Sequence, residues 1–295
     1  MKTVSTIVDL RADLAAPRRR GATIGLVPTM GALHAGHMSL VRAARSHCDV
    51  VVVSLFVNPT QFNDSADLVA YPRDADRDAG LLSAEGVDLL FAPSIDEVYP
   101  AGFATTVSVS GLTDRLEGAS RGRGHFDGVT TVVSKLLNIV GPDRAYFGQK
   151  DAQQALVIRR MVRDLNLPVR IEVCPTVRDA DGLALSSRNA LLSPTEREQA
   201  TALSRALAVI AETAQGGERR VKPLLTPAWA ELAGSGVTPE YLELVSPDTL
   251  KPVLQLDGEV LAVVAARVGS TRLIDNISIH PVAASVVADG EERPA

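Results

Sequence analysis

The chain has 295 residues, of which 46% are hydrophobic and 22% charged, and its formal net charge at pH 7 is −5. This length predicts about two domains, and the balanced composition excludes a collagen, a coiled coil and a largely disordered chain. The acidic balance argues against a nucleic-acid partner, and the absence of an apolar run near the ~20 residues of a membrane span predicts a cytoplasmic protein without a membrane partner.

The first part of the chain alternates apolar, β-branched runs with segments of helical periodicity. Its strands are predicted at residues 23–27, 50–57, 87–91, 145–147 and 169–174. Its helices are predicted at residues 39–46, 75–85, 128–140 and 152–165. The second run is apolar almost throughout, as strands buried on both faces of a parallel sheet are, and short connections favour a doubly wound, Rossmann-like α/β fold. Asp127 is expected to cap one helix and Gly141 to end it.

The pattern changes after residue 176. A polar turn region is expected at 177–189, a long helix at 194–215 and a second helix near 223–232. Strands are predicted at residues 241–245, 260–268 and 272–279. We therefore expect a Rossmann-like domain at 1–176, a smaller α+β domain at 177–285, and a disordered tail at 286–295.

The most informative stretch is residues 28–37, PTMGALHAGH, which follows a predicted strand and opens a helix. Open α/β sheets bind ligands at such a place. Gly31 and Gly36 let the backbone approach a ligand closely, and the free amides of a helix start attract phosphate oxygens. His34 and His37 are three residues apart, so both rings would point the same way and could stabilise charge on a phosphate. By itself HxGH is equally well explained as a helix entry with incidental histidines, and two ligands are too few to favour a zinc site.

A strand followed by HxGH resembles the HIGH signature of class I aminoacyl-tRNA synthetases and their nucleotidyltransferase relatives. The full string is more specific and resembles the pantothenate synthetase, or pantoate–β-alanine ligase, family. The resemblance continues, in the family's order, through residues 56–62 (FVNPTQF), 71–73 (YPR), 148–151 (GQKD) and 186–189 (SSRN). Five ordered blocks make a chance match very improbable.

The resemblance implies an ATP-dependent ligation in which pantoate forms a pantoyl adenylate and β-alanine then displaces AMP. The domain at 1–176 would bind nucleotide and pantoate, and the domain at 177–285 would act as a lid. The resemblance also implies ATP as a substrate, Mg²⁺ that arrives with the nucleotide and is held mainly by phosphate oxygens, and a homodimer. No protein ligand of the magnesium is predicted. The alternatives are an adenylate-forming enzyme that acts on another acid, and a module that senses ATP without turning it over.

The family's functional residues carry over to the matching positions of this chain. Four are expected to be catalytic: His34, His37, Lys150 and Arg188, with His37 as a proton donor. The expected ATP-binding residues are Met30, Gly31, Ala32, Leu33, His34, Ala35, Gly36, His37, Gly148, Gln149, Lys150, Asp151, Val177, Leu185, Ser186, Ser187 and Arg188. Gln61 and Gln154 are expected to bind pantoate and β-alanine, with Gln153 as the competitor of Gln154.

Two positions depart from the family's usual residues. Gln149 stands where Glu is common, which removes a charge and keeps hydrogen-bonding capacity, and Leu185 stands where Met is common, which keeps the volume. Neither change is expected to abolish function. Weaker candidates are Arg121, Arg123 and His125, which would line the site or form a basic loop. Asp74, Asp76 and Asp78 are more simply an exposed helix face than magnesium ligands.

Overall fold

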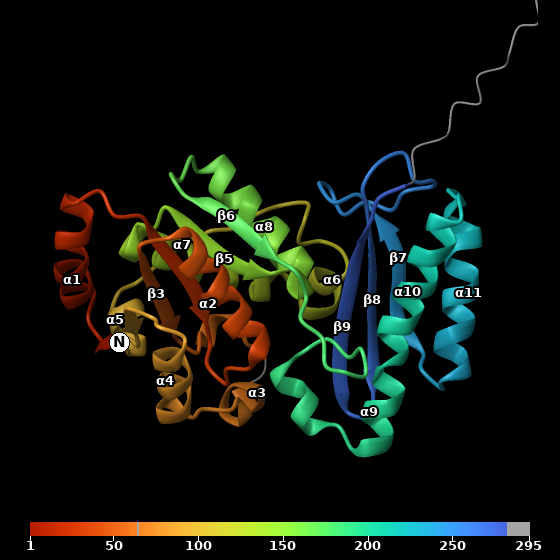
Figure 1. Cartoon of the computed structure of the whole chain (residues 1–295), viewed down its shortest axis with the longest axis horizontal. Coiled ribbons are helices and arrows are strands. Elements are labelled where there is room, and N and C mark those ends of the chain that lie inside the picture. The colour runs from red at the N-terminus through yellow and green to blue at the C-terminus, as the bar shows by residue number, and fades with distance from the viewer. Residues whose placement is uncertain (64, 282–295) are drawn as a thin grey trace, which may run out of the picture.

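The computed structural model (Figure 1) describes residues 1–63 and 65–281. Its larger sheet has six parallel strands in the order β1-β4-β3-β2-β5-β6. These strands are β1 (Lys2–Val4), β2 (Ile24–Thr29), β3 (Val50–Leu55), β4 (Leu89–Phe91), β5 (Arg144–Gly148) and β6 (Arg170–Cys174). From β2 the chain proceeds to β3 and β4 on one side, and β5 and β6 lie on the other. The strand order therefore reverses between β2 and β5, and a ligand crevice is expected at their carboxyl ends.

Helices cover both faces of this sheet. One face packs against α2 (Ala35–His47) and α4 (Ala75–Ala84), and the other against α1 (Ile7–Arg19), α7 (Arg123–Val140) and α8 (Ala152–Asp164). Neighbouring residues of a strand point to opposite faces, so β2 and β3 are apolar on both sides. Shorter helices are η1 (Pro59–Gln61), α3 (Ser65–Ala70), α5 (Ile95–Val98), α6 (Glu117–Arg121) and η2 (Gln149–Asp151). The predicted doubly wound α/β architecture is confirmed.

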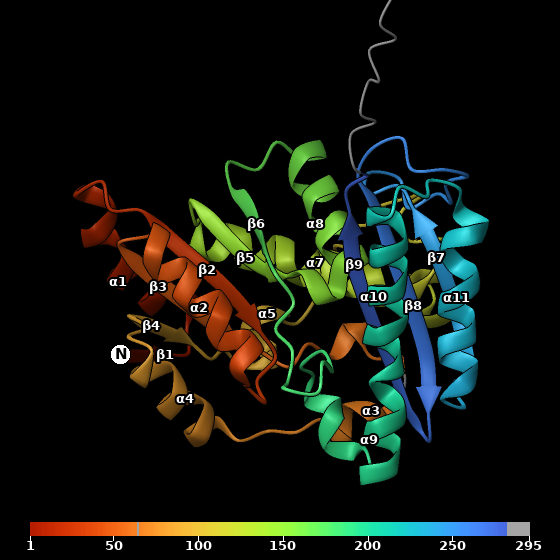
Figure 2. The same cartoon turned by 45° about the vertical axis from the view of Figure 1, so that its right-hand side comes forward.

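The smaller sheet is antiparallel and consists of β7 (Pro239–Val245), β8 (Val260–Val268) and β9 (Thr271–Ile279), in that order. One of its faces packs against α10 (Ala202–Gln215) and α11 (Val221–Gly234), as Figure 2 shows. The other face adds Leu261 and Val263 to the core around α7 and α8. The two sheets thus share hydrophobic contacts, and the chain between them contains η3 (Ser187–Leu191) and α9 (Pro194–Ala200).

Two helix predictions are wrong in detail. Helix α7 begins at Arg123, so Asp127 lies inside it and accepts a hydrogen bond from the Ser108 hydroxyl at 2.6 Å; the predicted stop at Gly141 is confirmed, with a φ of 54°. The helix expected at 194–215 is divided into α9 and α10 at Thr201. The Thr201 hydroxyl donates to the Glu198 carbonyl at 2.6 Å, a side-chain bond that competes with the helical ladder and bends helices.

The strand β1 and the helix α1 were not predicted, because α1 buries only a narrow stripe around Leu10 and Leu14. The boundary expected between residues 176 and 177 stays a prediction, which limited proteolysis in the turn region would test. The tail expected at 286–295 lies outside the described residues. Among the residues described, no helix is long and apolar enough to span a membrane.

Candidate functional site

A cavity of about 360 Å³ lies at the carboxyl ends of β2 and β5, with β9 of the smaller sheet forming part of its wall. It brings together most of the predicted site residues although they come from separate sequence blocks. Those lining it are Met30, His34, Gly36, His37, Gln61, Gly148, Lys150, Asp151, Gln154, Val177, Leu185, Ser186, Ser187 and Arg188. The crevice expected from the strand order is therefore the place where these blocks meet.

Five predicted ATP-binding residues do not line the cavity: Gly31, Ala32, Leu33, Ala35 and Gln149. Leu33 belongs to the core, and its backbone N–H donates to Asp78 Oδ1 at 2.9 Å. Gly31 and Ala32 have positive φ angles of 86° and 51°, so the loop turns sharply before the helix. Asp78 is 1% exposed, so the expected exposed helix face is wrong at this position: its carboxylate holds the loop.

The two histidines form the start of α2 through their own side chains. His34 Nδ1 accepts the Gly36 backbone N–H at 3.1 Å, and His37 Nδ1 accepts the His34 backbone N–H at 3.3 Å. In each neutral ring the proton therefore sits on Nε2. A side chain at Gly36 would clash with the His34 ring, since a Cβ there would lie 2.8 Å from Cε1. Each histidine can offer an Nε2–H to an anion in the cavity.

Both rings are held in the uncharged form. Burial, and then the charge of Lys150, lowers the pKa of His34, while burial, and then His34, lowers the pKa of His37 to about 3. At neutral pH His37 is therefore a hydrogen-bond donor without an additional proton. The proton-donor role expected of His37 stays a prediction.

The low pKa of His37 predicts acid sensitivity. The pKa of a histidine in the unfolded chain is near 6.5. Between that pH and about 3, His37 is therefore protonated in the unfolded chain and neutral in the folded chain. The free energy of unfolding is therefore unaffected by protonation of His37 above pH 6.5, and it decreases as the pH falls from 6.5 toward 3. We expect the free energy of unfolding in urea to fall between pH 6.5 and 4.5, with a smaller slope in His37→Gln. A wild-type stability that is flat or rising over this interval would contradict the account.

The Gln61 side chain is held by Asn58, a buried residue with several hydrogen-bond partners. Asn58, 1% exposed, donates from Nδ2 to Gln61 Oε1 at 3.0 Å and to the Gly128 carbonyl at 3.2 Å, while its Oδ1 accepts the Tyr99 hydroxyl at 2.8 Å. Helix α7 approaches η1 so closely that a Cβ at Gly128 would lie 2.5 Å from the Thr60 carbonyl oxygen. The glutamine is therefore positioned by a strand end and a helix together.

The two neighbouring glutamines of α8 have different surroundings. Gln153 is buried; its Oε1 accepts the Glu117 N–H at 2.9 Å, and its Nε2 donates to the carbonyls of Leu112 and Arg115 at 2.7 and 2.9 Å. Gln154 lines the cavity, and its amide has no hydrogen-bond partner among the described residues. Of the two, Gln154 is the one free to bind a ligand.

Two of the cationic side chains at the cavity, Lys150 and Arg188, come from separate segments. Lys150 follows β5, and its Nζ lies 4.0 Å from Asp151 Oδ1. Arg188 lies in the first turn of η3, where the Ser186 hydroxyl accepts its backbone N–H at 3.3 Å. Its guanidinium makes no ion pair within the described part of the chain. Arg188 is therefore available to an anion.

A tight hairpin brings Val177 and Leu185 together at the cavity. The Leu185 N–H donates to the Val177 carbonyl at 2.9 Å. This bond fixes the two backbone segments side by side. The hairpin explains how residues eight positions apart line one site.

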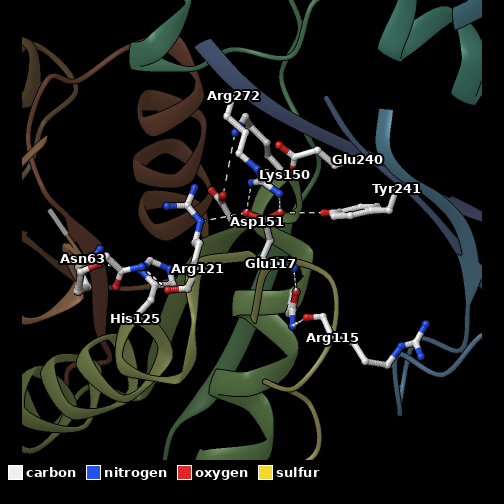
Figure 3. A network of polar contacts seen from close by, with 12 residues as sticks. Asn63, Arg115, Glu117, Arg121, His125, Lys150, Asp151, Glu240, Tyr241 and Arg272 are labelled. Atoms are coloured by element: carbon white, nitrogen blue, oxygen red, sulfur yellow. Dashed lines mark hydrogen bonds and ion pairs between the residues drawn. The ribbon is translucent and has the colours of Figure 1, made fainter. Parts of the chain in front are cut away.

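A charged network closes the side of the cavity next to the smaller sheet (Figure 3). Glu117 accepts two hydrogen bonds from Arg272 at 2.7 Å each, one from Tyr241 at 2.9 Å and one from Arg121 at 3.0 Å. Burial alone would raise the pKa of Glu117, but the Arg272 guanidinium beside it, and then Arg121, lower it to about 2. The carboxylate is therefore charged and joins α6 to β7 and β9.

Of the weaker candidates, Arg121 and His125 line the cavity and Arg123 does not. Sequence reasoning missed the residues that support the site from a distance, above all Asn276 of β9 and its neighbour Asp275. Both lie at the cavity and are about 5% exposed. The signal available was two adjacent polar residues in the middle of the strand RLIDNISI, where a buried amide and carboxylate need partners.

Known proteins resemble this chain over nearly its whole length. A family model described as Pantoate-beta-alanine ligase matches residues 2–278. A pantothenate synthetase of Moorella thermoacetica is 55% identical over 281 residues, covering 95% of this chain and 99% of that protein. A pantothenate synthetase structure from Thermus thermophilus has a TM-score of 0.90 at 50% identity, and the match covers 95% of this chain and 100% of that one.

A third relative is a pantoate-beta-alanine ligase from Francisella tularensis, whose structure is complexed with beta-gamma ATP and beta-alanine. It has a TM-score of 0.77 at 36% identity, and the match covers 94% of this chain and 97% of that one. The agreement extends over nearly the whole chain in sequence and in fold. The chain belongs to the pantoate–β-alanine ligase family.

Proposed function

We propose that the chain condenses pantoate with β-alanine at the expense of ATP, through a pantoyl adenylate, with release of AMP and pyrophosphate. The observation that carries this proposal is the convergence of the two histidines, Lys150, Arg188 and two amide side chains on one cavity. The family membership and the ATP- and β-alanine-bound Francisella relative support the same substrates.

In the first step a pantoate carboxylate oxygen attacks the α-phosphorus of ATP, and the bond to the bridging oxygen of pyrophosphate breaks. Both reactants are anions, so the protein must offset negative charge and align them. We assign this task to Lys150 and Arg188 as cations and to His34 and His37 as neutral donors. The pKa of His37 near 3 favours hydrogen-bond donation over proton transfer. The Val177 backbone is the proposed contact of the adenine.

In the second step the amine of β-alanine attacks the activated carbonyl, the bond to AMP breaks, and an amide forms. Gln61 and Gln154 are proposed to orient the acid and the amine. Gln154 has an amide without a partner among the residues described, and Gln61 is fixed by Asn58, so the two offer one adaptable and one rigid group. Bound AMP is a better leaving group than oxide, which is why activation precedes amide formation.

Magnesium fits the site as a companion of the nucleotide. Three carboxylates line the cavity, and Glu117 and Asp275 are already paired with arginines. Asp151 is the one whose carboxylate is half exposed, and the described residues contain no cluster of three metal-ligating side chains. We propose that phosphate oxygens hold most of the ion, with Asp151 as its candidate protein ligand. The ion would offset phosphate charge when bound.

Gln61→Ala should separate binding of the acid from binding of the nucleotide. Gln61 comes from η1 and not from the histidine, lysine or arginine segments, so its loss should weaken the use of pantoate and β-alanine. We expect the KM for pantoate to rise about tenfold or more, as for a lost hydrogen-bonding partner, with ATP affinity within about twofold. Calorimetry with ATP checks this, and Gln199→Ala on α9 is a matched control. A comparable loss of ATP affinity would contradict this division of tasks.

We also propose that the protein works as a homodimer, as the resemblance implies. We further propose that it is cytoplasmic and binds neither nucleic acid nor membranes, as its acidic charge and the lack of a long apolar run in the sequence indicate. Light scattering after gel filtration measures the molar mass and so the oligomeric state. Fractionation of cells shows whether the protein is in the cytoplasmic or the membrane fraction. A monomer at micromolar concentration, or a membrane-associated pool, would overturn the respective statement.

A panel of hydroxy acids and amines, with AMP formation as the readout, tests the proposed function. We expect AMP to form only with pantoate and β-alanine together at a steady rate, and no ADP. An adenylate-forming enzyme for another acid would ignore pantoate, and an ATP-sensing module would bind ATP without any acid-dependent release of AMP. Either result would overturn the proposal.

A further inference from the structure

Asn276 of β9 is a buried polar residue that the proposed chemistry does not use. It is 5% exposed, and among the described residues its side-chain amide bonds only to the segment that contains Lys150. Its Nδ2 donates to the backbone carbonyls of Gln149 and Lys150, each at 2.9 Å, and its Oδ1 accepts from Gln149 Nε2 at 3.1 Å. A buried amide is costly unless it is paired, and here the short helix η2 supplies every side-chain partner.

The two carbonyls lie on either side of the Lys150 Cα. The Gln149 carbonyl belongs to the peptide plane before Lys150, and the Lys150 carbonyl belongs to the plane after it. Because each peptide is planar, fixing both carbonyl directions restricts the φ and ψ of Lys150. One amide of the smaller sheet therefore sets the direction in which the Lys150 side chain leaves the backbone of the larger domain.

Gln149 fixes the orientation of the Asn276 side-chain amide. Its Nε2 donates to Asn276 Oδ1, which leaves both Nδ2 hydrogens for the two carbonyls. A glutamate at position 149 has no such donor. In this chain the orientation of the Asn276 amide therefore depends on the glutamine at position 149, whose side chain does not line the cavity.

Asp275, the residue before Asn276, connects the hairpin that contains Val177 to β9. Asp275, 4% exposed, accepts hydrogen bonds from the Arg178 guanidinium at 2.5 and 3.0 Å, and Arg178 follows Val177 directly. The Asp275 carboxylate also accepts the Asn276 N–H at 2.8 Å. Two consecutive residues of β9 thus fix η2 and the hairpin relative to each other.

We propose that Asn276 is a positioning residue for Lys150: it holds the lysine in the direction needed to meet a phosphate during adenylation. The proposal rests on the proposed function, because it takes Lys150 as the group that contacts phosphate. Asn276 touches no reacting atom itself. Its effect must therefore pass through Lys150, and this distinguishes positioning from general support of the fold.

The test is a double-mutant cycle on pantoate-dependent exchange of labelled pyrophosphate into ATP. Asn276→Ala and Asn276→Asp each should lower the exchange rate about 10–100-fold, as misplacement of a catalytic group does, with the KM for pantoate within about twofold. In a Lys150→Ala background the same changes should lower exchange less than about twofold further, because the interaction is already lost. Losses that multiply in the double variants would overturn the proposal.

Two further variants keep the test decisive. Ser278→Ala, two residues along β9 and outside the cavity, should leave exchange unchanged. Gln149→Leu removes only the donor that orients the amide and should lower exchange about threefold to tenfold, again only when Lys150 is present. If the Asn276 variants do not fold, unchanged exchange in Gln149→Leu overturns the proposal. Absence of pantoate-dependent exchange in the wild type would instead refute the proposed function.

Discussion

Lys150→Ala is expected to lower turnover about 10²–10³-fold, the usual loss for one group that stabilises charge in a transition state. The lysine follows β5 at the point where the strand order reverses, and its ammonium lies in a cavity that must accept a polyphosphate. The thermal unfolding midpoint should change little, since within the described part of the chain the Nζ has a single ion pair, of 4.0 Å with Asp151. Steady-state AMP formation by the purified variant measures the loss.

Lys251→Ala is the matched control, because Lys251 is exposed and lies outside the cavity. Its turnover should equal that of the wild type. A Lys150→Ala enzyme with normal activity and verified mass would remove Lys150 from the mechanism. It would also remove the basis for the positioning role of Asn276.

Arg272→Ala is expected to give the largest loss of stability, about 3 kcal/mol in the free energy of unfolding. Glu117 is 7% exposed and would lose two hydrogen bonds of 2.7 Å each, which leaves a buried carboxylate with Arg121 and Tyr241 only. The pKa of Glu117, now about 2, should rise, because burial then outweighs the remaining attraction. Urea unfolding at pH 7 measures the loss.

The sign of the pH effect follows from that pKa. A carboxylate with a lowered folded pKa stabilises the protein above its ordinary value near 4.5 and loses that contribution as the pH falls toward 2. The advantage of the wild type over Arg272→Ala should therefore be largest near neutral pH. Arg267→Ala, which removes an exposed partner of Glu240 at 3.4 Å, should cost under about 0.5 kcal/mol. Equal losses in the two variants would contradict the distinction between a buried and an exposed pair.

Most site residues were assigned from the family resemblance, and two of its blocks lie together because parallel strands end at one sheet edge. Met30, which follows β2, and Lys150, which follows β5, meet for that reason, and the periodicity of the chain was enough to place both strands. The histidine pair was also predictable, since three-residue spacing at a helix start sets the two rings side by side, with centroids 4.1 Å apart.

The rest depended on contacts that no local pattern records. Glu117 and Arg272 are 155 positions apart, and Asn276 and Lys150 are 126 apart, so neither periodicity nor spacing connects them. The start of α7 was missed because Gly122 and Gly124 suggest a loop, whereas packing against η1 extends the helix through this region. The choice between Gln153 and Gln154 likewise needed the buried partners that only the fold supplies.

Exchange of labelled pyrophosphate into ATP tests the central claim most directly, because an adenylation that precedes amide formation can run backwards without any amine. With pantoate and magnesium present and β-alanine absent, we expect label to enter ATP, and we expect none without pantoate. His34, Lys150 and Arg188 line the cavity and are assigned to this step alone. Exchange that requires β-alanine would contradict the two-step mechanism, and its absence with pantoate under all conditions would contradict the assigned reaction.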